Sequence, residues 1–323
     1  MYKTMVKAGI KERDFHTGEV ILNYVAGPDN GPPLVFIPGQ TVTWEEYYLI
    51  MPMLADRFQV FAVTLRGHGK SSWTPGRYTF NQLGADMTAF LRDVVRRPAI
   101  VVGNSSGGVL AAWLAANARE HVKAIVLEDP PLFRCDYPNI KTTFVYDGFL
   151  DLSKMAVPNS GGYAGLLANA RPIPVDPSGK TKEVPKLVLK VASFMMAWHQ
   201  AFFPGTPLDL KLLPPMLRIM IKGFSQFDGH FSRAFVEGTM GEGFDHAETL
   251  GRITQPVLFL HANWFMYEGR LVGALDDDDV ARVRSLVKGL WKYVRMDCSH
   301  GIALDVPRRE AEEISTWANE CLR

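Results

Sequence analysis

Cysteine is scarce in this sequence, and neither sign of charge dominates it. The three cysteines, Cys135, Cys298 and Cys321, lie far apart and form no Cys-x-x-Cys motif. Their spacing excludes a disulfide framework and a zinc knuckle, and it favours a reducing compartment. The 35 lysine and arginine residues nearly balance 34 aspartate and glutamate residues, which leaves a formal net charge of +1 and no charged tail. We therefore expect no nucleic-acid partner and no acidic lipid partner.

Long hydrophobic runs are also missing. The first fifteen residues are rich in lysine and lack the apolar region of a secretory signal. The longest apolar runs, such as 109–116, are far shorter than the roughly 20 residues that span a bilayer. Hydrophobic residues make up 47% of the 323 positions and charged residues 21%, which excludes a disordered or coiled-coil chain. The sequence predicts a soluble, cytoplasmic protein without a membrane segment.

Short runs of valine, isoleucine and phenylalanine recur between glycines and prolines. They are too short for most helices and apolar on both faces, as in the buried strands of a parallel sheet. These runs are 34–37, 60–64, 100–102, 124–127, 257–260 and 293–296, and 19–25 is expected to form an antiparallel edge. Helical patterns lie between them at 80–95 and 108–117. This alternation predicts an α/β fold with a doubly wound, mostly parallel sheet.

The alternation stops after Pro131 and resumes near Arg252. The segment between is rich in methionine and aromatic residues, with helical stretches at about 184–203 and 208–224. Because so apolar a segment cannot stand alone in water, we expect a helical cap over the sheet, inserted between strands 6 and 7. The predicted boundaries are 1–131 and 251–323 for the core and 132–250 for the cap. Methionines adapt to irregular apolar shapes, which favours a cap that lines a pocket over an ordinary structural insertion.

A Gly-x-Ser-x-Gly motif provides the strongest chemical signal. Gly103-Asn104-Ser105-Ser106-Gly107 follows a predicted strand and precedes an alanine-rich helix, which is the context of a nucleophile elbow. Glycines beside such a serine keep its oxygen exposed on a strained turn. Ser105 is therefore the candidate nucleophile. The alternative, an anion-binding turn, lacks the glycine-rich phosphate motifs that usually accompany it.

Three further motifs accompany the elbow. They are Phe36-Ile37-Pro38-Gly39 followed by Trp44, the segment Leu65-Arg66-Gly67-His68-Gly69-Lys70-Ser71, and Ser299-His300-Gly301. With them the sequence resembles the α/β-hydrolase fold superfamily over residues 20–131 and 252–322. The resemblance implies a serine, an acid and a histidine in that chain order, with the histidine after the last strand. His300 occupies that position and is the candidate general base.

The acid is not where most of the superfamily has it. Many members carry it after the seventh strand, where this sequence has Phe265. A minority place it after the sixth strand, which here ends in Glu128-Asp129. Strand alternation sends these two side chains to opposite faces, so only one can reach His300. We favour Asp129, with Glu128, Glu268 and the run 276–279 as alternatives; that run is also suited to capping a helix.

The resemblance also implies an oxyanion hole made of two backbone N–H groups, those of Gln40 and Ser106. Pro38 stands where relatives usually carry histidine, but the donors are backbone groups and survive this change. Candidate pocket residues are Gly39, Trp44, Met195 and Met196, with core packing as an equal alternative for Trp44. No metal or cofactor motif is found, and Ser-His-acid chemistry needs no cofactor.

These features predict a serine hydrolase that cleaves, through an acyl-enzyme, an ester or lactone of a bulky hydrophobic substrate, with a small hydrophobic ester or lactone molecule as its only partner apart from a possible second copy. The Gly-x-Ser-Ser-Gly elbow and the acid after the sixth strand resemble the zearalenone lactonases of fungi and bacteria. In that group the acid also lies 24 residues beyond the serine, as Asp129 lies beyond Ser105, although it is a glutamate. Alternatives are another carboxylesterase, an amidase, a carbon–carbon bond hydrolase, a slow-turnover ligand receptor or a protein with a dead site. The apolar insertion suits a homodimer as well as a ligand.

Overall fold

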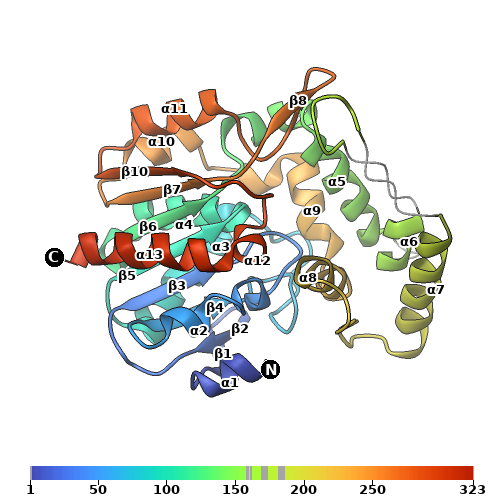
Figure 1. The fold of residues 1–323 in the computed structure, drawn as a ribbon, viewed down its shortest axis with the longest axis horizontal. Helices are drawn as coiled ribbons and strands as arrows, with labels where there is room; N and C mark the ends of the chain where they lie inside the picture. Colours follow the sequence, from blue (N-terminus) through green and yellow to red (C-terminus); the bar gives the residue numbers. More distant parts are fainter. Residues whose placement is uncertain (1, 158–159, 161, 169–173, 181–185, 323) are drawn as a thin grey trace.

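An eight-stranded sheet forms the centre of the computed structural model (Figure 1), which describes residues 2–157, 160, 162–168, 174–180 and 186–322. Its strand order is β1-β2-β4-β3-β5-β6-β7-β10, and all neighbours from β4 to β10 are parallel. The strands are β1 (Lys11–His16), β2 (Ile21–Ala26), β3 (Pro33–Ile37), β4 (Gln59–Val63), β5 (Ala99–Asn104), β6 (Val122–Glu128), β7 (Val257–His261) and β10 (Trp291–Arg295). This sheet confirms the predicted fold class.

The edge of the sheet differs from the prediction. The segment expected at the edge forms β2, which is antiparallel to both of its neighbours, and β1 lies outside it as the true edge strand. Strand β1 has the polar sequence Lys-Glu-Arg-Asp-Phe-His and is largely exposed. Charged side chains protect an edge strand from pairing with other chains, so a search for apolar runs overlooks this strand.

Helices cover both faces of the sheet because the strand residues alternate between two apolar clusters. In β5, Val101 packs with α3 and α4 on one face, and Val102 packs with α2, α12 and α13 on the other. The helices of these layers are α1 (Lys3–Lys7), α2 (Met51–Leu54), α3 (Phe80–Phe90), α4 (Ser106–Asn117), α11 (Asp277–Leu286), α12 (Ile302–Asp305) and α13 (Pro307–Leu322). The helical pattern predicted for 80–95 ends in a π-helical turn at Leu91–Val95.

A helical insertion follows β6; its helices α5–α9 lie to one side of the sheet, and α10 lies beside α11 (Figure 1). It contains α5 (Phe144–Ser153), α6 (Gly162–Ala168), α7 (Lys186–Phe202), α8 (Pro215–Phe224), α9 (Gly229–Glu237) and α10 (His246–Gly251). Phe231 and Phe235 of α9 and Leu250 of α10 join the apolar cluster of α3 and α4, so this half of the insertion packs directly on the core. Within the described ranges, no helix is long and apolar enough to cross a membrane.

Two predicted helices of the insertion have other boundaries. Helix α7 begins at Lys186, and the first two residues of the predicted stretch lie outside the described residues. The stretch 208–224 is helical only from Pro215 onward. Pro214 and Pro215 explain the late start, because proline fits the first turn of a helix and disfavours helical backbone in the residue before it.

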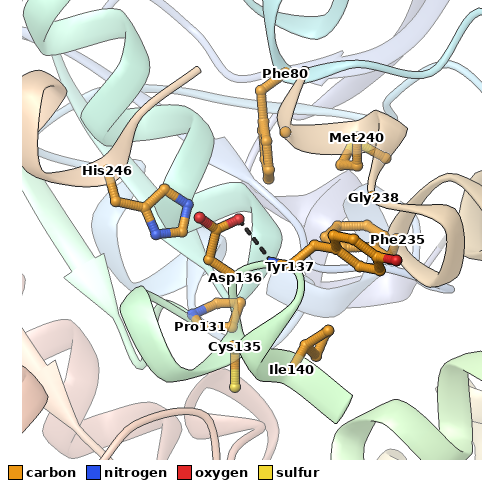
Figure 2. Close-up of a pocket in the computed structure, with 11 residues that line it drawn as sticks. Phe80, Pro131, Cys135, Asp136, Tyr137, Ile140, Phe235, Gly238, Met240 and His246 are labelled. Atoms are coloured by element: carbon orange, nitrogen blue, oxygen red, sulfur yellow. Dashed lines mark hydrogen bonds between the residues drawn. The ribbon is translucent and has the colours of Figure 1, made fainter. Parts of the chain in front are cut away.

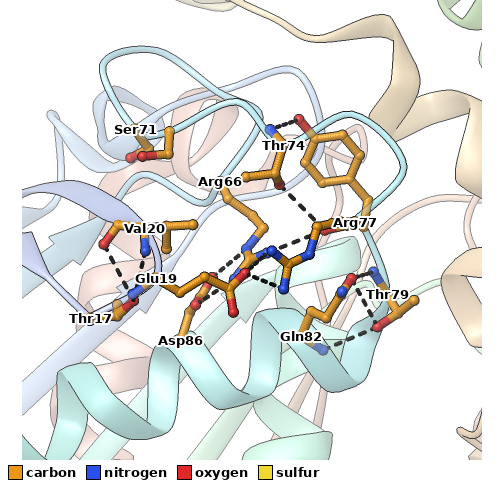
Figure 3. A network of polar contacts seen from close by, with 12 residues as sticks. Thr17, Glu19, Val20, Arg66, Ser71, Thr74, Arg77, Thr79, Gln82 and Asp86 are labelled. Atoms are coloured by element: carbon orange, nitrogen blue, oxygen red, sulfur yellow. Dashed lines mark hydrogen bonds and ion pairs between the residues drawn. The ribbon is translucent and has the colours of Figure 1, made fainter.

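The turn that carries His68 is fixed to α3 by a buried arginine (Figure 3). The Arg66 side chain is 1% exposed and donates two hydrogen bonds to Asp86, Nε to Oδ2 at 2.6 Å and Nη2 to Oδ1 at 2.7 Å. Its Nη1 donates to Glu19 Oε1 at 3.0 Å, and Arg77 also pairs with Glu19. Such a bidentate pair between arginine and carboxylate fixes the orientation of both side chains as well as stabilising their charges. This network therefore has a structural role: it fixes the turn at residues 65–71 on α3.

Candidate active site

Ser105 lies at a sharp turn between β5 and α4. Its backbone is in an unusual conformation, with φ 54° and ψ −127°, and its N–H donates to the Glu128 carbonyl at 2.9 Å. A Cβ on Gly107 would lie 2.2 Å from the Ile37 carbonyl oxygen, and one on Gly103 would lie 2.2 Å from the Gly107 carbonyl oxygen. Both positions therefore require glycine. The neighbours of Ser105 are buried and Ser105 itself is half-buried, which is the exposure that a nucleophile elbow provides.

His300 lies on the loop between β10 and α12 and contacts Asp129. The distance between His300 Nδ1 and Asp129 Oδ2 is 2.6 Å, and the Asp129 side chain is 3% exposed against 45% for His300. Burial lowers the pKa of His300, but the hydrogen bond and charge of Asp129, with a contribution from Glu46, raise the pKa above its ordinary value. The His300 imidazole thus contacts the Asp129 carboxylate through Nδ1, while part of the ring remains exposed.

Asn104 connects this histidine loop to the elbow. Its side-chain Nδ2 donates to the His300 carbonyl at 3.1 Å and to the Glu128 carbonyl at 3.4 Å. Within the described part of the chain, Ser105 Oγ and His300 share no hydrogen bond. Catalytic hydrogen bonds are often long in substrate-free sites and tighten when the substrate binds.

The other acid candidates lie elsewhere. Glu128 is fully buried on the opposite face, where its Oε2 accepts from Tyr47 Oη at 3.1 Å, and burial raises its pKa to about 8. Glu268 is exposed at the turn between β8 (Phe265–Tyr267) and β9 (Arg270–Val272). Asp276 accepts from the N–H of Asp279 at 2.9 Å and caps α11. Asp129 is thus the candidate that the fold brings to His300.

The loop after β3 presents the first candidate oxyanion donor. Gly39 N–H donates to Glu46 Oε2 at 2.9 Å, and Thr41 N–H donates to His68 Nε2 at 3.1 Å. Between them, the N–H of Gln40 has no acceptor among the described residues, and neither has the N–H of Ser106. The N–H groups of Gly39 and Thr41 are therefore held by side chains, while the Gln40 N–H between them remains available as a donor, close to the N-terminus of α4.

His68 can accept the Thr41 hydrogen bond because it stays neutral. Its side chain is 1% exposed, and burial lowers its pKa to about 4. Nδ1 then carries the proton and donates to the Arg66 carbonyl at 3.1 Å, which leaves Nε2 as an acceptor. The buried Arg66–Asp86 pair thus helps to hold the oxyanion loop through His68.

The candidate pocket residues lie in different surroundings. Gly39 is next to the elbow, since a Cβ on it would lie 3.0 Å from Ser105 Cβ. Trp44 is 5% exposed and its Nε1 donates to Asn23 Oδ1 at 3.1 Å within the core. On α7, Met195 is 43% exposed and Met196 is buried in a small apolar cluster of the insertion.

Sequence reasoning did not single out three residues around the site: Glu46, Asn104 and Met216. A Cβ on Gly301 would lie 2.2 Å from Met216 Cε, so this methionine of α8 packs on the histidine loop. The methionine content of the insertion signals such a contact but does not say which methionine makes it. The sequence does not indicate that Glu46 is the glutamate that contacts Gly39, because Glu45 beside it has an identical side chain.

The insertion is attached to the core at the oxyanion loop. Gln40 Nε2 hydrogen-bonds Ser232 Oγ of α9, and Lys222 of α8 pairs with Glu45 at 2.6 Å. The backbone of Gly223 lies against the Thr41 carbonyl. These three contacts join α8 and α9 to the segment 40–45, which carries the Gln40 N–H.

A small hollow lies apart from these residues, between α3, α9 and the segment after β6 (Figure 2). Its volume is about 20 Å³, enough for about one water molecule. It is lined by Phe80, Phe235, Gly238, Met240, Gly241 and His246, together with Pro131, Cys135, Asp136, Tyr137 and Ile140 of the segment after β6. Ser105, Asp129 and His300 are not among its lining residues, so this hollow is not the substrate site of the chemistry described above.

Comparisons with known proteins agree with the fold. A family profile described as alpha/beta hydrolase fold matches residues 32–157. The chain is 33% identical to 2-(acetamidomethylene)succinate hydrolase of Mesorhizobium japonicum over 112 aligned residues. This alignment covers 35% of this chain and 40% of that protein. It is also 30% identical to 3-oxoadipate enol-lactonase 2 of Acinetobacter baylyi over 110 aligned residues, which are 34% of this chain and 41% of that protein. The matched segment thus spans about two fifths of each relative.

Solved structures extend the likeness to the whole chain. The enol-lactonase of Burkholderia xenovorans has a TM-score of 0.62 at 14% identity, covering 95% of this chain and 100% of that one. The chain has the α/β-hydrolase fold, as the resemblance in its sequence implies. The two relatives named above are a hydrolase and an enol-lactonase. The narrower resemblance to zearalenone lactonases stays a prediction.

Proposed function

We propose that this chain is a serine hydrolase of esters or lactones, with Ser105 as nucleophile, His300 as base and Asp129 as orienting acid. The contact between His300 Nδ1 and Asp129 Oδ2 at 2.6 Å carries the proposal, because it joins two residues 171 positions apart beside a strained serine turn. A carboxylate in this place holds the imidazole with Nδ1 protonated, so that Nε2 is free to accept the serine proton.

The proposed reaction has two halves. In the first, Ser105 Oγ attacks the carbonyl carbon while His300 Nε2 takes its proton, and the N–H groups of Gln40 and Ser106 stabilise the oxyanion. The intermediate then expels the alcohol oxygen, which takes the proton from His300 and leaves an acyl-enzyme. In the second half, water attacks the acyl carbon while His300 Nε2 takes the water proton. His300 then gives this proton to Ser105 Oγ as the bond between Oγ and the acyl carbon breaks, which releases the acid and free Ser105.

We propose a bulky hydrophobic substrate, with a zearalenone-type macrolactone as the particular candidate. The division into a core, 1–131 and 251–323, and a cap, 132–250, belongs to this proposal. Its supports are the apolar insertion attached to the oxyanion loop, the Gly-x-Ser-Ser-Gly elbow and the position of the acid after β6. An amidase or a carbon–carbon bond hydrolase would use the same groups, so the substrate has to be tested directly.

The test is hydrolysis of zearalenone beside p-nitrophenyl esters of increasing chain length, with products identified by mass. The wild type is compared with Ser105→Ala, which should abolish turnover of every substrate. Efficient opening of the macrolactone supports the full proposal. Turnover of short esters alone supports a serine hydrolase and contradicts the macrolactone assignment. A single turnover without a second indicates a slow receptor.

A further inference from the structure

Glu46 is a buried carboxylate beside the proposed site. It lies on the 3₁₀ turn Trp44–Tyr47, its exposure is 4%, and its Oε2 accepts the Gly39 N–H at 2.9 Å. Gly39 in turn lies against Ser105, with a Cβ built on it only 3.0 Å from Ser105 Cβ. Glu46 is thus one peptide away from the proposed oxyanion donor at Gln40.

No lysine or arginine of the described residues forms an ion pair with Glu46, whereas Glu45 beside it pairs with Lys222 at 2.6 Å. Burying a carboxylate without a cation costs stability unless its oxygens are well hydrogen-bonded. Burial raises the pKa of Glu46 to about 7, and the Gly39 hydrogen bond and the nearby His300 oppose that rise. A buried carboxylate that lowers the stability of the fold and lies next to a proposed nucleophile is a candidate for a functional role.

We propose that Glu46 is a positioning residue of the site: it fixes the Gly39 peptide, so that the Gln40 N–H points at the oxyanion, and its carboxylate favours the imidazolium of His300. The inference rests on the proposed function. Both effects belong to the same step, because the oxyanion and the imidazolium form together when Ser105 attacks the substrate.

Other titratable groups around Glu46 have to be considered in any test. Its charge also acts on Glu128 from β6, on Glu310 from α13 and on the neighbouring Tyr47. His300 in turn faces both Asp129 and Glu46. The experiment therefore needs a readout that reports on His300 alone.

The experiment combines NMR titration of the His300 imidazole with kinetics on p-nitrophenyl butyrate. The His300 signals are assigned by their loss in His300→Gln. Glu46→Gln keeps an oxygen that can accept from Gly39 N–H but removes the charge, so it should lower the pKa of His300 and reduce kcat modestly, with KM unchanged. Glu46→Ala also frees the Gly39 peptide, and its kcat should fall about 10²-fold, as on loss of an oxyanion donor.

Glu120→Gln is the control, since it removes an exposed carboxylate on Arg119–His121, between the C-terminus of α4 and the start of β6 and away from the site. It should leave the pKa of His300 unchanged and kcat within about twofold of the wild-type value, on the argument that charge effects weaken with distance. Thermal melting verifies that each variant folds. If Glu46→Ala does not fold, the near-isosteric Glu46→Gln decides the question.

The outcomes separate this inference from the proposed function. An active wild type whose His300 pKa and kcat are unchanged in both Glu46→Gln and Glu46→Ala overturns the positioning role and leaves the hydrolase proposal intact. A wild type that hydrolyses no ester, but whose His300 pKa falls in Glu46→Gln, contradicts the hydrolase proposal and supports the link between Glu46 and His300.

Discussion

Asp129 and Glu128 are adjacent in the sequence, but only the Asp129 carboxylate reaches His300. Glu128 continues the alternation of β6 and points toward Tyr47, whereas Asp129 has φ 47° and turns out of the strand toward the histidine loop. Their adjacent positions make the pair a natural internal comparison. Asp129 pairs with an accessible imidazole, and Glu128 is buried among other acids.

The comparison gives a prediction at the residue scale. Asp129→Asn should reduce kcat on p-nitrophenyl butyrate by about 10³- to 10⁴-fold, because the amide no longer holds the imidazole in the reactive tautomer. Glu128→Gln should keep kcat within a few-fold of wild type, and so should Glu268→Gln. Steady-state kinetics with a melting curve for each variant measure this. A large loss in Glu268→Gln with none in Asp129→Asn would refute the assignment of the acid.

Much of the candidate site could be predicted from local sequence. Ser105 and His300 lie in short motifs with a fixed place relative to strands, and the acidic pair Glu128-Asp129 marks the end of β6. The positive φ of Asp129, which turns its side chain away from that of Glu128, was not predicted. Glu46 and Met216 could not be found this way. Their roles depend on which side chain of a turn or helix is buried against a distant loop, and that is decided by packing between segments far apart in the sequence.

At the scale of elements, buried strands and amphipathic helices were predictable because burial imposes an apolar pattern. The edge strand β1 was not, since it is exposed and polar. Helix α8 was predicted too long because apolar periodicity continues through residues 208–214, although Pro214 and Pro215 set the start of the helix. Proline therefore limits helix boundaries more strongly than periodicity does.

Helix α8 gives the element-scale prediction. A Cβ on Gly223 would lie 1.9 Å from the Thr41 carbonyl oxygen, so Gly223→Ala should destabilise the fold by ~1–3 kcal/mol and lower kcat by displacing the oxyanion loop. The matched control is Gly148→Ala in α5, where nothing beyond the adjacent backbone of the same helix lies within 4 Å of the new methyl group. Alanine there should stabilise the protein by ~0.5–1 kcal/mol. Urea denaturation of both variants is the measurement, and equal effects would contradict the close contact.

At the scale of the whole molecule, three buried acids share the core on the α13 side of the sheet. Glu46, Glu128 and Glu310 are at most 4% exposed. Burial raises the pKa of Glu46 to about 7 and that of Glu128 to about 8, and it raises the pKa of Glu310 well above its ordinary value. At neutral pH the folded protein therefore holds protons on Glu128 and Glu310, and in part on Glu46, that the unfolded chain releases.

This difference predicts how stability depends on pH. Between about pH 4.5 and 8 the folded state binds more protons at these groups, so their contribution to the free energy of unfolding falls as pH rises, by about 1.4 kcal/mol per pH unit for each proton. Glu310→Gln removes one such group and should raise Tm more at pH 8 than at pH 5. Melting curves of wild type and variant across this range test the prediction. An equal shift at both pH values would show that Glu310 is ionised in the folded protein.

The central claim is that Ser105 is a nucleophile activated by His300. The most direct test is reaction of the folded protein with a fluorophosphonate, followed by peptide mapping of the adduct. We predict one adduct on Ser105 in the wild type, no adduct in Ser105→Ala and much slower labelling in His300→Ala. Failure of the folded wild type to react, or equal labelling of Ser105→Ala, would contradict the account.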